Sequence, residues 1–146
     1  MLICDISVIN KFGKLSLGRS LAPLGLNWQE MIVILVIEQM PGANQDFLEP
    51  FLQTDKGNIT KLIKKMETSA LLFKRPNESD RRNLQLFLTE KSQALLPVLK
   101  ALLENWEEAC LKGLSHQERS LLKTLNARVI ENMIFTAEGR QIKWTD

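Results

Sequence analysis

The segment Asp55–Thr68 carries the pattern that most restricts the fold of this chain. Its apolar residues recur at i, i+3, i+4 and i+7, a spacing that places them on one face of an α-helix. Asp55 is a favourable N-cap residue for such a helix. The apolar positions are Ile59, Leu62, Ile63 and Met66, and the other side carries Lys56, Asn58, Thr60, Lys61, Lys64 and Lys65. We therefore predict a helix that is buried on one face and basic on the other.

Two more helices are predicted before this basic helix. Asn27 as N-cap and Glu30 three residues later form a capping box, which predicts a buried helix that reaches Met40. A short helix follows at about Gln45–Leu52, and Pro50 should kink or shorten it because proline lacks a backbone N–H. A short helix joined by a tight turn to a helix with a basic free face is the helix-turn-helix pattern.

A β-hairpin is predicted directly after the basic helix. The segments Leu71–Arg75 and Leu84–Leu88 are rich in strand-forming residues, and apolar side chains alternate in the second one. The loop between them, residues 76–83, is polar and contains the adjacent pair Arg81 and Arg82. A hairpin with arginines at its tip, placed after a basic helix, is typical of the wing in a winged helix-turn-helix.

The distribution of charge is more informative than the net charge, which is only +2. Nine basic and four acidic residues between Lys56 and Lys91 give that segment a net charge of +5, so the rest of the chain carries −3. A basic centre of this kind suits a surface that binds phosphate. Charge alone does not distinguish such a surface from a solvated, charged face.

Long helices are predicted on both sides of the winged lobe. They cover about Asp5–Leu21, Thr89–Leu111 and a last helix that begins at a capping box of Ser115 and Glu118 and ends near Phe135. These helices carry more apolar residues than a lone lobe can bury, so they fit either a homodimer core, which we favour, or an intramolecular bundle. The residues expected in the dimer core are Leu17, Leu21, Leu102, Leu103, Trp106, Val129 and Met133.

The expected fold class is mainly α with a small β-hairpin wing. We predict a single winged helix-turn-helix domain over residues 1–146. Within it, residues 27–89 form the DNA-binding lobe with its wing at 71–89, and residues 1–24 and 90–135 form the helical dimerisation body.

Other function classes find little support in the sequence. Cys4, Cys110 and His116 have no metal-ligand spacing, so neither a metal nor another cofactor is expected. One histidine, no tyrosine and no nucleophile–base pair argue against an enzyme. The longest apolar run, Met31–Ile37, is too short to cross a bilayer, and the start of the chain lacks a secretory signal pattern. A cytoplasmic protein that does not enter a membrane is expected.

The hairpin and the basic helix carry a family resemblance. Asp80, Arg82 and the pair Leu88-Thr89 match the wing signature of the MarR family, and Asp55–Ile63 is similar to that family's recognition helix. The resemblance implies a homodimeric transcriptional regulator, expected to be a repressor, that binds a pseudo-palindromic site in double-stranded DNA. It also implies a small, often aromatic or phenolic, effector bound between body and lobe.

Individual side chains can be given roles on this basis. Asn58, Thr60 and Lys61 are candidates to read base edges in the major groove, and Lys56 and Lys64 are candidates for phosphate contacts.

In the wing, Arg81 and Arg82 are expected in the minor groove, whose negative potential attracts arginine. Asp80 is expected to brace the loop by holding the Arg82 guanidinium. For the effector pocket, the candidate residues are Phe12, Arg19 and Trp28.

Three departures from the family pattern keep a second hypothesis open. Ser69-Ala70 stand where a glycine usually makes the turn into the wing, and an alanine there suggests a different turn because positive φ is costly for it. Glu49-Pro50 replace an alanine and a helix former, and Gly57 replaces a serine. The alternative is therefore a dimeric ligand- or protein-binding module of the same fold with little specific DNA binding.

Overall fold

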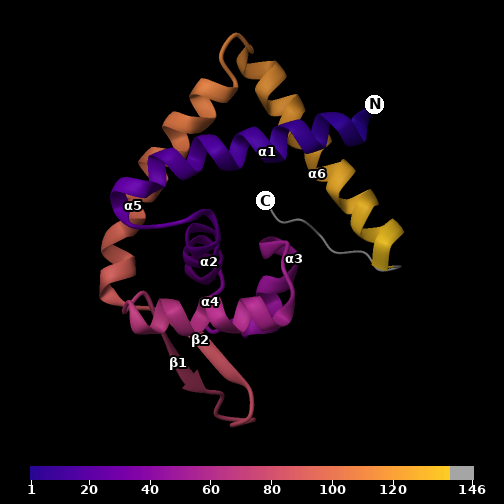
Figure 1. Cartoon of the computed structure of the whole chain (residues 1–146). Coiled ribbons are helices and arrows are strands. Elements are labelled where there is room, and N and C mark those ends of the chain that lie inside the picture. The colour runs from indigo at the N-terminus through magenta and orange to yellow at the C-terminus, as the bar shows by residue number, and fades with distance from the viewer. Residues whose placement is uncertain (139–146) are drawn as a thin grey trace. The chain divides into compact units, whose positions relative to one another are not determined.

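The computed structural model describes residues 1–138, which are mainly helical with one two-stranded sheet (Figure 1). The predicted fold class is confirmed. The elements in chain order are α1 (Leu2–Leu21), η1 (Ala22–Leu24), α2 (Trp28–Gln39), η2 (Gln45–Leu48), α3 (Glu49–Leu52), α4 (Lys56–Thr68), β1 (Leu72–Pro76), β2 (Leu84–Leu88), α5 (Glu90–Cys110) and α6 (His116–Glu138). The chain divides into a first unit, Met1–Glu104, and a second unit that begins at Asn105.

Capping residues start the helices where the sequence predicts them. The Glu30 N–H donates to Asn27 Oδ1 at 3.0 Å while the Asn27 N–H donates to Glu30 Oε2 at 2.9 Å, so the capping box of α2 is complete. Asp55 Oδ1 accepts from the Asn58 N–H at 2.8 Å at the start of α4. Since these contacts span only three residues, they form wherever the chain places the cap correctly.

The short helix before α4 is two pieces rather than one. Residues Gln45–Leu48 form the 3-10 turn η2, and Glu49–Leu52 form the single α-helical turn α3. Pro50 lies in the first turn of α3, where a backbone N–H has no partner within the helix. The proline therefore separates the two pieces instead of kinking one helix.

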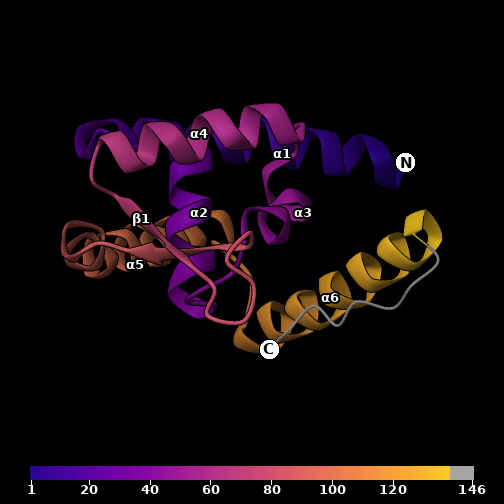
Figure 2. The same ribbon diagram turned by 90° about the horizontal axis from the view of Figure 1, so that it is seen from below.

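The core of the first unit surrounds α2. In Figure 1 this helix is seen end-on between α1 and α4, and Figure 2 shows it from the side. Its apolar run is buried on several sides, which explains why the run lacks a polar face. Fully buried members of this core include Met31, Val33, Ile34 and Ile37 of α2 and Ile59, Ile63 and Met66 of α4.

Two residues assigned to the dimer core belong to this core instead. Leu17 and Leu21 of α1 are only 3% and 0% exposed within the single chain. The prediction for them was wrong because helical periodicity shows that a face is apolar without showing which surface covers it. The apolar residues that α1 leaves exposed are Leu2, Ile3, Val8, Ile9, Phe12 and Leu15.

The hairpin is antiparallel and extends beyond α4 (Figure 1). Leu72 pairs with Leu88 and Pro76 pairs with Leu84, so β1 begins one residue later than predicted and β2 has its predicted bounds. Segment 42–44 lies on the other side of β2, where the Gly42 N–H donates to Leu86 O at 2.9 Å. The hairpin is thereby joined to the chain between α2 and η2.

The turn from α4 into β1 keeps a left-handed residue despite lacking glycine. Ala70 has a φ of 55°, so the expectation that alanine would change the turn was wrong. Side chains from the start of α5 bind three successive carbonyls there. Thr89 Oγ1 donates to Ala70 O at 2.6 Å, Lys91 Nζ donates to Ser69 O at 2.8 Å, and the buried Ser92 hydroxyl donates to Leu71 O. These contacts define the turn clamp.

The second unit contains the end of α5 and α6. Ser115 and Glu118 form the predicted capping box, and the Ser115 hydroxyl and backbone N–H, which both donate to Glu118 Oε2 at 2.7 Å, lower the pKa of that carboxyl. Arg119 spans the turn between the helices by pairing with Glu108 at 2.5 Å and donating to Leu114 O at 3.1 Å. The exposed large apolar residues of α6 are Leu121, Leu122, Leu125, Met133 and Phe135.

Within residues 1–138, no single helix is long and apolar enough to cross a membrane. The segments Leu2–Leu24 and Trp28–Gln39 satisfy the length and composition criteria only as a pair bent by 81°.

Candidate nucleic-acid interface

The exposed face of α4 carries two lysines whose ammonium groups lack an ion-pair partner among the described residues. They are Lys61 and Lys64, both fully on the solvent side of the helix, because the other side holds the buried stripe from Ile59 to Met66. Such lysines are available for phosphate, and their position on a recognition-type helix fits contacts in or beside the major groove.

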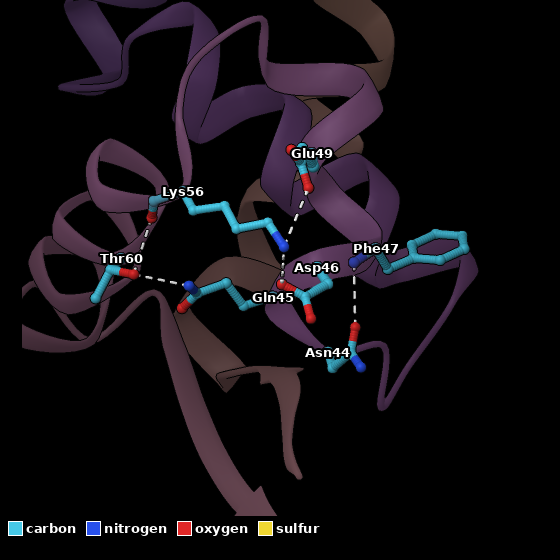
Figure 3. Close-up of polar contacts among 7 residues, drawn as sticks. All are labelled: Asn44, Gln45, Asp46, Phe47, Glu49, Lys56 and Thr60. Carbon is cyan, nitrogen blue, oxygen red and sulfur yellow. Dashed lines mark hydrogen bonds and ion pairs between the residues drawn. The ribbon is translucent and has the colours of Figure 1, made fainter. Parts of the chain in front are cut away.

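Lys56, at the start of the same helix, is in a different position. Its Nζ lies 3.6 Å from Asp46 Oδ1 and 3.7 Å from Glu49 Oε2 (Figure 3). Asp46 belongs to η2 and Glu49 begins α3, so both acids come from the segment that precedes the turn of the helix-turn-helix. Two carboxylates thus surround the one basic group predicted to bind phosphate at this end.

The two polar candidates for base reading also have partners within the protein. Asn58 Nδ2 donates to Asp55 Oδ2 at 2.8 Å, which leaves its carbonyl oxygen and one N–H for other contacts. The Thr60 hydroxyl donates to Lys56 O at 2.9 Å and accepts from Gln45 Nε2 at 2.7 Å (Figure 3). The structure therefore places both side chains on the exposed surface, with Thr60 held by two hydrogen bonds.

Two more basic residues of the charged segment are paired with acids. Lys65 lies 2.8 Å from Glu30, a carboxylate only 3% exposed in the first turn of α2. Lys74 of the hairpin lies 2.7 Å from Glu67 of α4. These pairs tie α4 to its neighbours and reduce the positive charge that the segment presents.

The wing loop presents both of its predicted arginines to solvent. Arg81 and Arg82 are exposed, and neither guanidinium has an ion-pair partner among residues 1–138. Asp80 does brace the loop, but its Oδ1 accepts from the Arg82 backbone N–H at 3.1 Å rather than from the guanidinium. The prediction named the correct pair of residues and the wrong donor, so the guanidinium stays available.

One exposed arginine of the hairpin was missed. The Arg75 guanidinium carbon lies 5.0 Å from the centre of the Phe73 ring and 5.4 Å from that of Phe87, and the two rings stack at 5.5 Å. Stacking on aromatic faces holds the guanidinium in place. Phe73 and Arg75 share a strand face by alternation, so the sequence contained this signal.

Among the described residues, no recorded contact joins the candidate effector residues Phe12, Arg19 and Trp28, and their assignment stays a prediction. The Phe12 ring is 56% exposed, and the Trp28 ring lies 5.5 Å from the ammonium of Lys14. Arg19 is also exposed. A cavity of about 430 Å³ lies elsewhere in the first unit, and its lining includes none of the three. It is lined by Ile37, Glu38, Pro41, Phe73, Phe87, Leu88, Gln93 and Leu96.

Metal binding receives no support from the described residues, which contain no group of three or more His, Cys, Asp or Glu placed to hold an ion. Cys4 and Cys110 are both free and exposed.

Comparison with known proteins agrees with this geometry. The model of the MarR family matches residues 26–84. An uncharacterized HTH-type transcriptional regulator of Bacillus subtilis (strain 168), YybA, is 28% identical over 110 residues, which cover 75% of this chain and 73% of that protein.

Solved structures of similar proteins extend the match to nearly the whole chain. A putative MarR family transcriptional regulator from Listeria monocytogenes, complexed with 26mer DNA, is 26% identical with a TM-score of 0.84 and covers 97% of both chains. A MarR transcriptional regulator from Methanosarcina mazei Go1 is 26% identical with a TM-score of 0.79, covering 90% of this chain and 96% of that one. The helix-turn-helix, the hairpin and these matches together confirm that the chain resembles the MarR family of transcriptional regulators.

Proposed function

We propose that this regulator binds a pseudo-palindromic site in double-stranded DNA as a homodimer and represses transcription from it. The observation that carries the proposal is the set of unpaired basic groups on α4 and the wing, Lys61, Lys64, Arg81 and Arg82. With α4 in the major groove and the wing loop at the minor groove, the lysines and the arginines would all contact DNA. The similar Listeria protein complexed with DNA supports the same use.

Exposed apolar side chains support the homodimer. In α1 they include Val8, Ile9 and Phe12, each more than half exposed, and α6 has an exposed row of its own from Leu121 to Phe135. Monomeric proteins rarely leave large apolar patches in water, so such faces are typical of an interface. A second copy of the chain would cover them and would place two basic helices on one DNA duplex.

An effector is the third part of the proposal, and the cavity beside the hairpin is its candidate site. The Phe73 and Phe87 rings suit an aromatic ligand, and the Glu38 carboxylate is the charged group in the lining. That carboxylate is paired with the Lys100 ammonium at 2.5 Å, so the lining offers no free charge to an ionic ligand, and an uncharged phenolic or aromatic compound fits it better. Binding there would act on the hairpin directly.

The test is fluorescence-anisotropy binding to DNA from upstream of the regulator's own gene, against scrambled DNA, over a salt series. Specific regulators bind their sites at least about a thousandfold more tightly than other DNA. That preference, weakened by Arg82→Ala, would support the proposal. Weak and equal binding, followed by failure of a random-sequence selection to enrich any palindrome, would favour the module without specific DNA binding.

A further inference from the structure

The contacts of Lys56 make the start of α4 the least positive part of its exposed face. The Lys56 ammonium lies within 4 Å of two carboxylates, at 3.6 Å from Asp46 and 3.7 Å from Glu49 (Figure 3). One cation and two anions leave this cluster, which we term the Lys56 cluster, with a net charge of −1. The side chains of Lys56, Asp46 and Glu49 are 65%, 69% and 48% exposed, so all three are accessible to a ligand.

A second contact holds the same two segments together. Gln45 Nε2 donates to Thr60 Oγ1 at 2.7 Å. Gln45 directly precedes Asp46 in the chain, and Thr60 lies one helical turn after Lys56. Because residues four apart share a helix face, Lys56 and Thr60 present the same side of α4 to η2. Lys56 therefore meets its two carboxylates through a defined packing of η2 on α4, and not through a chance approach of one long side chain.

The cluster has a consequence for DNA that the charge of the sequence does not suggest. The first residues of a recognition helix lie closest to the bases and the phosphates beside them. For Lys56 to bind a phosphate, its ammonium must leave both carboxylates, which would then face the DNA without a counter-ion. We propose that Asp46 and Glu49 hold Lys56 as an internal counter-ion and so lower the affinity of this regulator for DNA of any sequence. This inference rests on the proposed DNA-binding function.

Lys64 supplies the matched comparison on the same helix. It is exposed like Lys56, and its ammonium has no ion-pair partner among residues 1–138. Each lysine that neutralises a phosphate adds about 0.9 to the slope of log K against log salt. We therefore expect Lys64 to contribute to the salt dependence of binding and Lys56 to contribute little, although both are lysines of one helix face.

The experiment measures anisotropy of the full chain with a fluorescein-labelled duplex of about 30 base pairs of arbitrary sequence, from about 50 to 200 mM salt. Lys64→Ala is expected to reduce the slope by about 0.9, and Lys56→Ala by less than about 0.3. The double variant Asp46→Asn with Glu49→Gln should raise both the affinity for DNA and the salt slope. Its increase in affinity over the wild type should be about threefold larger at about 50 mM than at about 200 mM salt. Adding Lys56→Ala to that double variant should then remove about 0.9 from the slope.

The outcomes distinguish failure of the Lys56 inference from failure of the proposed DNA-binding function. If Lys56→Ala alone flattens the slope as much as Lys64→Ala, or if the Asp46→Asn and Glu49→Gln variant binds like the wild type, the cluster does not limit affinity and the inference is wrong while DNA binding stands. If the wild type binds without salt dependence and Lys64→Ala also has no effect, the proposed function fails and this inference fails with it. Circular dichroism of each variant confirms that the helices are intact.

Discussion

The recognition helix α4 and the wing loop present positive charge in different ways. On α4, Lys56 and Lys65 are paired with acids that lie earlier in the chain, and only Lys61 and Lys64 are unpaired among the described residues. In the loop, Arg81 and Arg82 are both unpaired within the same part of the chain, because Asp80 bonds to backbone. A count of charges along a sequence segment therefore overestimates the charge of a helix that folds against acids from elsewhere.

If the loop is the stronger half of the interface, removing its charge should have the largest effect. We expect the double variant Arg81→Ala with Arg82→Ala to weaken specific binding by about 5- to 150-fold for each arginine, roughly 1–3 kcal/mol apiece. Anisotropy titration of a selected operator measures this loss. Lys74→Ala is the control, since Lys74 lies in the same hairpin but is paired with Glu67. An equal loss in the control would show that the hairpin fold, and not the arginines, was disturbed.

The unpaired lysines of α4 should have smaller effects on binding. We expect Lys64→Ala to weaken operator and scrambled DNA by similar factors and to reduce the salt slope by about one unit, as for a phosphate contact. The slopes of both titrations provide the measurement. Lys61→Ala, at a candidate base-reading position, should weaken binding to the operator more than binding to scrambled DNA, and equal losses on both would assign Lys61 to phosphate instead.

A substitution in the turn from α4 into β1 should change the stability of the fold. Ala70 adopts a φ of 55°, where an L-residue with a Cβ is strained and glycine is not. We expect Ala70→Gly to raise the free energy of unfolding by about 0.5–1 kcal/mol, the relief of strain being partly offset by the greater freedom of glycine in the unfolded chain. Urea denaturation measures the change. Lower stability would mean that the turn clamp already offsets the strain.

The smallest effect on DNA is expected at Lys65. Its ammonium pairs with buried Glu30, so Lys65→Ala should leave the salt slope unchanged while lowering the melting temperature slightly. Binding titration and thermal unfolding of the same preparation test both parts. A flatter slope would show that Lys65 leaves Glu30 to reach phosphate, and the contrast between α4 and the loop would then be weaker than proposed.

Local signals predicted much of this fold. The caps at Asn27, Asp55 and Ser115 act over three residues, so their helices begin where the sequence indicates. The hairpin followed from alternation and a polar loop. The recognition helix was visible because its apolar stripe and its basic face are both encoded in one short segment.

Contacts made across the fold were not predictable in the same way. The acids that pair with Lys56 and Lys65 lie 7 to 35 residues away, and nothing in the local pattern distinguishes these lysines from Lys61. Leu17 and Leu21 look like the other apolar residues of α1, yet they pack within the chain. Partner choice depends on which surfaces meet, and that information is absent from the periodicity of a single helix.

The turn clamp has a mechanical consequence. The three consecutive carbonyls that follow α4, those of Ser69, Ala70 and Leu71, accept hydrogen bonds from Lys91, Thr89 and Ser92, so the end of α4 is tied to the start of α5. A rotation of α5 at this joint cannot be absorbed by bending the turn without breaking several of these bonds. We therefore expect such a rotation to turn α4 as well, which would change the depth and angle at which that helix enters a groove.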